Sequence, residues 1–168
     1  PLVRMLQDSS PIFTTDKYDD HGKWMDGWES RRRRGGGHDH AIIALAVPGT
    51  IDGFDVDTSF FTGNHPPECR IEACRSDGDP DDATNWTELL PMQHLEPDSH
   101  HFLPCGDDNV WSHLRFHIHP DGGVARLRVF GTPYLDPAHL KDRDIDLVAT
   151  LNGGRIIAYS DVHYGTYH

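Results

Sequence analysis

The sequence predicts an all-β protein, an antiparallel jelly roll or a related β-sandwich. Short segments of β-prone residues recur between clusters of Gly, Pro, Asp and Asn, and this pattern is typical of a sandwich or barrel. Clear helical periodicity is absent. The 168 residues are enough for one domain with a full core. About seven or eight strands, separated by turns roughly every dozen residues, fit a jelly roll.

The first predicted strands lie between residues 41 and 90. Ala41–Val47 is a continuous apolar run, which is typical of a central strand. The Pro48–Gly49 pair predicts a turn after it, so Ile51–Asp57 is expected to return as the second strand of a hairpin. Arg70–Arg75 and Trp86–Leu90 are predicted as further strands.

Trp111–His119 is the clearest strand, because apolar and polar residues alternate along it. Successive side chains of a strand point to opposite faces. The inward face is formed by Leu114, Phe116 and Ile118. The outward face carries His113, Arg115, His117 and His119. We therefore expect one buried apolar face and one polar face toward solvent.

A second hairpin is predicted after this strand. Pro120–Gly123 has the residues of a tight turn, because glycine adopts positive φ at little steric cost. Val124–Phe130 then returns as the partner strand, with Leu127 on its apolar face and Arg126 and Arg128 on the other.

Composition argues against several classes of partner. The formal net charge of −12 at pH 7 would repel a phosphate backbone, and the basic run Arg31–Arg34 is too local to overcome it. No apolar stretch approaches the roughly 20 residues of a membrane helix. We therefore expect a soluble chain with no nucleic-acid partner and no membrane contact.

The cysteines indicate an intracellular protein. Cys69, Cys74 and Cys105 are odd in number and have no zinc-like spacing, which favours reduced thiols over a disulfide framework. The first residues lack the features of a secretory signal. We expect a cytoplasmic location, with the peroxisome as the alternative, although the last residues are no peroxisomal signal.

Four blocks of sequence stand out and occur in a definite order. They are Asp26–Arg34 with Gly37–Asp39, then Asp55–Pro67, then Ile71–Ala73 with Trp86–Leu89, and finally Pro120–Gly131. The first reads Asp-Gly-Trp-Glu before an arginine-rich run. In content and order these blocks resemble the allantoicase family, and the resemblance covers nearly the whole chain. One departure is His40, where that family usually has an aromatic residue.

The resemblance implies a jelly-roll sandwich of the galactose-binding-like kind. It also implies a hydrolase that converts allantoate to ureidoglycolate and urea in allantoin and purine breakdown. No cofactor is expected. The family enzyme has two tandem repeats, whereas residues 1–135 resemble the first repeat without its opening strand. Residues 136–146 are predicted as a linker, and residues 147–168 resemble the opening strand of the second repeat.

The chain is thus permuted relative to one repeat, because an opening strand stands at its end and not at its start. Two arrangements follow from this order. The chain is a fragment or half-length product, or its last segment fills the empty slot at the front, in the same molecule or in a neighbour. We therefore expect a homo-oligomer or pairing with a second repeat, with a small molecule, allantoate, as the substrate.

The chemistry of allantoate defines the residues to look for. A guanidinium should bind its carboxylate, carbonyl or carboxylate oxygens should accept the ureido N–H groups, and a proton-transfer pair should assist cleavage. The catalytic candidates are Glu29, His65 and Asp57. The substrate-binding candidates are Asp26, Arg31, Arg33, Asn64 and Arg126.

Each candidate also has a purely structural interpretation. The arginine run suits a solvated basic patch or an intersubunit strip of ion pairs. Asn64 and His65 suit a surface turn, and Asp57 suits a cap for backbone donors at a strand end. Asp121 and Arg126 suit a pair that caps the turn.

Two other functions remain open at this point. A lone repeat could bind a small polar ligand or sugar without turnover, because fold alone does not decide function. The histidine pairs could instead belong to a metal-dependent, cupin-like enzyme. No glutamate follows His40 at the spacing of a cupin metal motif, so we expect no metal site.

Overall fold

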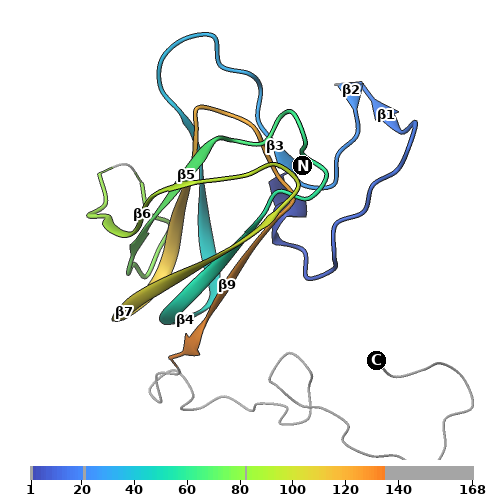
Figure 1. Cartoon of the computed structure of the whole chain (residues 1–168). Helices are drawn as coiled ribbons and strands as arrows, with labels where there is room; N and C mark the ends of the chain where they lie inside the picture. The colour runs from blue at the N-terminus through green and yellow to red at the C-terminus, as the bar shows by residue number, and fades with distance from the viewer. Residues whose placement is uncertain (1, 21, 82, 135–168) are drawn as a thin grey trace, which may run out of the picture. The chain divides into compact units, whose positions relative to one another are not determined.

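The computed structural model describes residues 2–20, 22–81 and 83–134 (Figure 1). These residues belong to a unit that spans Pro1–Leu135. The linker predicted at 136–146 and the strand segment predicted at 147–168 lie outside the described residues, so both stay predictions.

The described part of the chain is all-β except for one short 3-10 helix, and its strands pair antiparallel. The elements are η1 (Leu2–Leu6), β1 (Tyr18–Asp19), β2 (Gly22–Lys23), β3 (Trp28–Glu29), β4 (Asp39–Asp57), β5 (Glu68–Cys74), β6 (Thr87–His94), β7 (His100–His119), β8 (Gly123–Val124) and β9 (Arg126–Pro133). The main sheet has the order β6-β5-β7-β4-β9, and β1-β2 and β3-β8 form two small ribbons. The predicted fold class is confirmed. No helix among these residues is long and apolar enough to cross a bilayer.

Two long strands, β4 and β7, connect the two layers of the jelly roll. The first part of β4 pairs with the second part of β7, from Asp39 opposite Ile118 onward. Register shifts follow between Ala44 and Gly53, and the second part of β4 then pairs with the first part of β7. β5 pairs with the second part of β7, and β9 with the second part of β4. Figure 1 shows both long strands changing direction midway.

The first predicted hairpin is wrong, because β4 runs without a reversal through Pro48 and Gly49. These two residues lie where the pairing with β7 is interrupted, so they bend the strand instead of turning it. The Pro48 carbonyl accepts a hydrogen bond from the Tyr134 N–H at 2.7 Å. A Cβ on Gly49 would lie 2.5 Å from the Thr132 carbonyl oxygen, so glycine permits the close approach of β9.

The second predicted hairpin is also wrong. β7 already pairs with β5 along one edge and with β4 along the other, so no edge is left for the chain that follows it. That chain instead forms β8, which pairs with β3, and then β9, which pairs with β4. The strands predicted at Arg70–Arg75 and Trp86–Leu90 are confirmed as β5 and β6, with shifted ends.

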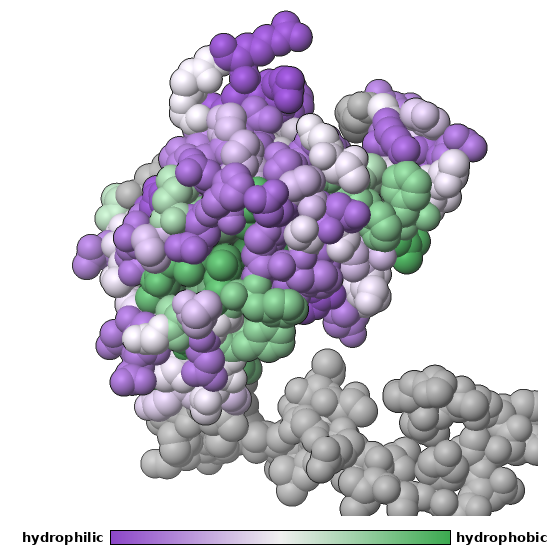
Figure 2. Space-filling view, viewed as in Figure 1, coloured by the Kyte–Doolittle hydropathy of each residue, from purple (hydrophilic) through white to green (hydrophobic). Residues whose placement is uncertain are grey.

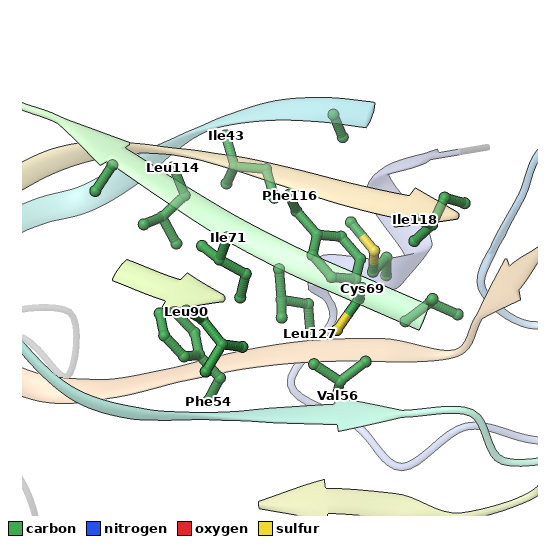
Figure 3. Close-up of a cluster of buried hydrophobic side chains, with 14 of the residues drawn as sticks. Ile43, Phe54, Val56, Cys69, Ile71, Leu90, Leu114, Phe116, Ile118 and Leu127 are labelled. Atoms are coloured by element: carbon green, nitrogen blue, oxygen red, sulfur yellow. The ribbon is translucent and has the colours of Figure 1, made fainter. Parts of the chain in front are cut away.

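The core lies between the two layers, and Figure 3 shows side chains from both pointing into it. The residues predicted to point inward from β7, namely Leu114, Phe116 and Ile118, are all fully buried. Phe54 and Leu127 meet them from the other layer. Burial of these side chains is the main force holding the layers together.

The outward face of β7 differs from the prediction. His113 and His117 are 9% and 3% exposed, so they do not point into open solvent. His117 contacts Glu72 on β5 and His38 in the segment before β4, and His113 contacts the Ser112 hydroxyl.

The three cysteines are free and buried. Burial raises the pKa of the Cys69 thiol to about 12, so this group stays protonated at neutral pH. These thiols therefore serve as small apolar side chains in the core.

Two phenylalanines of β7 allow a matched test of this core. Phe116→Ala should lower the free energy of unfolding by about 3–5 kcal/mol, because it removes a fully buried ring. Phe102 is 73% exposed, so Phe102→Ala should change it by no more than about 0.5 kcal/mol. Urea denaturation of both variants checks this, and equal losses would contradict the two-layer core.

Candidate functional site

Three segments of the chain meet at one end of the sandwich (Figure 1). They are the arginine segment 30–38 between β3 and β4, the loop 58–67 between β4 and β5, and the turn 120–122 between β7 and β8. Figure 2 shows mainly hydrophilic side chains at this end of the molecule. The segments are far apart in sequence, and the ends of three adjacent paired strands bring them together.

Backbone hydrogen bonds hold the turn between the other two segments. The Gly123 N–H donates to the Asn64 carbonyl at 2.7 Å, and the Ser30 N–H donates to the Gly122 carbonyl at 3.0 Å. The Gly122 N–H donates to the Ser30 hydroxyl at 3.2 Å. The relative positions of the three segments are therefore fixed by main-chain contacts.

Gly122 makes this packing possible. Its φ of +144° favours glycine. A Cβ at this position would lie 2.5 Å from the Pro66 nitrogen and 2.8 Å from the Asn64 carbonyl oxygen. Only a residue without a side chain lets the turn approach the loop this closely.

A cavity of about 490 Å³ lies among these segments. Its polar lining includes Glu29, Arg32, Arg33, Asn64, His65 and Asp121. The Asn64 amide Nδ2 donates to Glu29 Oε1 at 2.7 Å. The predicted residues Glu29, Arg33, Asn64 and His65 thus share one cavity. We call it the rim cavity.

Two carboxylates fix Arg33 at the rim cavity. Its Nε donates to Asp39 Oδ1 at 2.6 Å, and its backbone N–H donates to Asp121 Oδ2 at 2.6 Å. Burial raises the pKa of Asp39, but hydrogen bonds from Ser30 and Arg33 outweigh this and hold the pKa below its usual value. Asp39 is therefore ionised at neutral pH, and Arg33 has a defined position.

His65 presents an unusual atom at the same place. Its Nδ1 is buried and has no hydrogen-bond partner within the described part of the chain. A buried ring nitrogen usually has such a partner. Its unmet hydrogen bond distinguishes His65 among the residues that line the rim cavity.

Asp26 and Arg126 do not line the rim cavity. They form a buried ion pair, with Arg126 Nη2 2.7 Å from Asp26 Oδ2. Arg126 also donates to the carbonyls of Asp26 and Ser9. Burial raises the pKa of Asp26, but hydrogen bonds from Arg126 and the Ile12 backbone outweigh it and lower the pKa. In this structure the pair ties the chain before β3 to β9.

Asp57 and Arg31 also lie outside the rim cavity. Asp57 is fully buried. Its Oδ1 accepts the Ser59 N–H at 2.8 Å, and its Oδ2 lies 3.6 Å from Arg128 Nη1. Arg31 lines a neighbouring cavity of about 450 Å³, to which Arg32 and Arg33 also contribute.

The structure adds Arg32, Asp39 and Asp121 to the site. Asp39 follows the arginine segment directly, and Asp121 lies in a glycine turn. Each aspartate therefore had an ordinary structural interpretation that did not require a ligand. Asp39 and Asp121 belong to the site because the arginine segment contacts the turn 120–122. The periodicity of a single sequence gives no signal for such a long-range contact. Among the described residues, no cluster of three or more His, Cys, Asp or Glu side chains is arranged to hold a metal ion.

Two glycines at the rim cavity permit a matched test of this geometry. Gly122→Ala should lower the free energy of unfolding by about 1–3 kcal/mol from backbone strain, because its φ lies in the glycine region. The new Cβ would also press on the loop. Gly63→Ala should be nearly neutral, because a Cβ there meets nothing within 4 Å. Thermal and urea denaturation measure both, and a neutral Gly122→Ala would refute the close approach.

Comparison with protein families identifies the matching group. The model of the family described as "Allantoicase repeat" matches residues 2–134. A protein named "Probable allantoicase" from Rhizobium meliloti (strain 1021) is 61% identical over 165 residues, which cover 98% of this chain and 48% of the relative. Another with that name from Pseudomonas aeruginosa (strain UCBPP-PA14) is 53% identical over 167 residues, covering 98% of this chain and 50% of the relative.

Solved structures agree with these relatives. A structure described as "Structure of allantoicase" aligns with a TM-score of 0.73 at 31% identity, over 99% of this chain and 50% of that one. The crystal structure of allantoicase from Saccharomyces cerevisiae aligns with a TM-score of 0.69 at 32% identity, over 98% of this chain and 50% of that one. The chain thus spans about half the length of the curated relatives it matches.

Proposed function

The chain belongs to the allantoicase family, and from this membership we propose that it hydrolyses allantoate to ureidoglycolate and urea. The observation that carries the proposal is the convergence of Glu29, Arg33, Asn64 and His65 on the rim cavity. Together these side chains supply a cation, a neutral amide and two proton-transfer groups. A small anion with two ureido groups requires this set.

Substrate binding is assigned to Arg33 and Asn64. The Arg33 guanidinium, held by Asp39, binds the allantoate carboxylate through charge-assisted hydrogen bonds. Asn64 uses an N–H to bind Glu29, so its carbonyl oxygen accepts a ureido N–H. Arg32 lines the same cavity and adds positive charge.

The proton transfers are assigned to Glu29 and His65. Water adds its oxygen to the central carbon of allantoate, and the bond from that carbon to one ureido nitrogen breaks. Glu29 accepts a proton from the attacking side, and His65 delivers one to the departing nitrogen, so that urea leaves neutral. The contact of Glu29 with Asn64 orients the carboxylate for this role.

The remaining candidates are assigned positioning roles. The Asp26–Arg126 ion pair holds the chain that enters β3, and so the position of Glu29. Asp57 caps the start of the loop 58–67, which carries Asn64 and His65. Neither acts on substrate directly in this proposal.

The working enzyme is proposed to contain two repeats. Relatives are about twice as long as this chain, so a second repeat, in the same polypeptide or in another copy, completes it. We propose an intracellular, cytoplasmic setting, which the free and buried cysteines support.

Urea release from allantoate tests the reaction. The chain is incubated with allantoate, alone and together with a second-repeat chain, and urea and ureidoglycolate are measured. Glu29→Gln should lower the rate by about 10²–10⁴-fold, because the proton acceptor is lost, while allantoate still binds. Glu88→Gln on the exposed face of β6 is the control and should keep full activity. Binding without turnover in every preparation would instead indicate a non-catalytic binding module.

Binding of the carboxylate is tested at the arginine segment. Arg33→Gln should weaken allantoate binding roughly 10- to 100-fold, because a charged hydrogen bond contributes about 1.5–3 kcal/mol. Arg34→Gln removes the same formal charge from the next residue, which lines neither cavity, and should have little effect. Titration calorimetry gives both values. An equal loss in the two variants would mean that only net charge matters.

A further inference from the structure

A partly buried polar network lies on the outer face of β5 and β7. Its centre is Glu72 on β5, whose side chain is 14% exposed. Arg115 Nε and His117 Nε2 each lie 2.7 Å from Glu72 Oε2, and Arg70 Nη1 lies 2.8 Å from Oε1. The cross-strand register places Glu72 opposite Arg115.

These donors fix the charge of Glu72. Burial raises its pKa, but the hydrogen bonds from Arg115, Arg70 and His117 outweigh that and lower the pKa to about 2. At any pH above about 4 the carboxylate is ionised and can only accept hydrogen bonds. His117 must therefore donate to it from Nε2.

This fixes the protonation of two histidines in turn. Burial, the largest cause, lowers the pKa of His117 to about 4, so its ring is neutral at pH 7. With the proton on Nε2, its Nδ1 holds a lone pair. That atom lies 2.8 Å from His38 Nε2, so His38 donates to His117. The network is a directional chain from His38 through His117 to Glu72.

The His38 end of this hydrogen-bonded chain lies where the arginine segment joins β4. His38 also stacks on His119, with ring centroids 4.1 Å apart. The next residue, Asp39, binds Arg33 Nε, and its N–H donates to the Pro120 carbonyl at 3.1 Å. None of His38, His117 and Glu72 lines the rim cavity, yet His38 directly precedes Asp39, which holds Arg33.

We propose that the His38–His117–Glu72 chain is a positioning element that anchors the end of the arginine segment, so that Asp39 holds the Arg33 guanidinium at the rim cavity. The link to allantoate rests on the proposed function. The anchoring itself does not, because it concerns contacts within the protein.

Acid should release this anchor. A protonated His117 carries hydrogens on both nitrogens, so its Nδ1 can no longer accept from His38. The titratable and charged groups that face this pair are Arg70 and Glu72 from β5, His119 from β7, and Arg33, Asp39 and His40 from the arginine segment and β4. Burial also lowers the pKa of His38. Both histidines have lower pKa values folded than unfolded, so their contribution is complete above about pH 6.5 and is lost as pH falls toward 4.

Histidine NMR and amide exchange of the full chain, without allantoate, test the anchor. At pH 7.5 both rings should be neutral with the proton on Nε2. His117→Leu should raise the exchange rates of the Arg33 and Asp39 amides at least about tenfold, since each is hydrogen-bonded only while the segment is docked. His94→Leu is the control, because the His94 side chain is 68% exposed, and should leave both rates unchanged.

His117→Gln supplies a second, independent readout. Glutamine carries a donor and an acceptor but does not titrate. The variant should keep both amides protected at pH 7.5. It should also lose the steep fall in protection factor, the ratio of intrinsic to observed exchange rate, that we expect for the natural chain between pH 6.5 and 4.5. If His117→Leu does not fold, this comparison decides the proposal, and an unchanged pH profile in His117→Gln overturns it.

Measuring allantoate binding distinguishes the proposed anchor from the proposed function on which it builds. With both correct, His117→Leu raises the dissociation constant of allantoate about tenfold, and His117→Gln restores it at pH 7.5. If allantoate does not bind the natural chain but the amides respond as expected, the anchor stands and the proposed function fails. If allantoate binds and His117→Leu changes neither exchange nor affinity, the anchor is wrong.

Discussion

The pairing of β4 with β7 is the constraint on which the rest of the structure depends. The two strands meet twice, once in each layer; β5 adds to β7, β9 adds to β4, and β6 adds to β5. Their antiparallel register also assembles the site. The start of β4 at Asp39 lies opposite Ile118 near the end of β7, and the start of β5 at Glu68 lies opposite His119. The arginine segment, the turn and the loop 58–67 must therefore emerge at the same end.

The charge of the rim cavity differs from that of the chain as a whole. The net charge is −12, but charges further apart than about 8 Å are largely screened at physiological salt. At the rim cavity the guanidiniums of Arg32 and Arg33 are matched by the carboxylates of Glu29 and Asp121, so the lining is close to neutral by formal charge. Asp39 accepts a hydrogen bond from the Arg33 side chain, and Asp121 accepts one from its backbone N–H. Elsewhere some basic groups are paired within the fold, as Arg126 is with Asp26.

The sequence predicted the apolar face of β7 better than it predicted which strands pair. Alternation along β7 identified Leu114, Phe116 and Ile118 as core residues, because a strand has a period of two wherever it lies. Both hairpins failed, because a Pro-Gly pair can bend a strand as well as reverse it, and because nothing local shows that β7 has both edges occupied. For the site, family blocks brought Glu29, Asn64 and His65 together, whereas the Asp26–Arg126 pairing depends on a contact between distant segments.

The buried network around Glu72 shows why stability alone is a poor account of such groups. Removing an ionised carboxylate from water is costly, and a buried ion pair can often be replaced by apolar side chains without loss of stability. Leucine or valine on β5 and β7 could therefore cover this outer face equally well. What apolar side chains cannot supply is direction. A carboxylate that only accepts fixes the proton of His117, which in turn fixes the donor of His38. Ordered donors and acceptors specify one position for the segment that follows, and a binding site for a small polar molecule requires that single position.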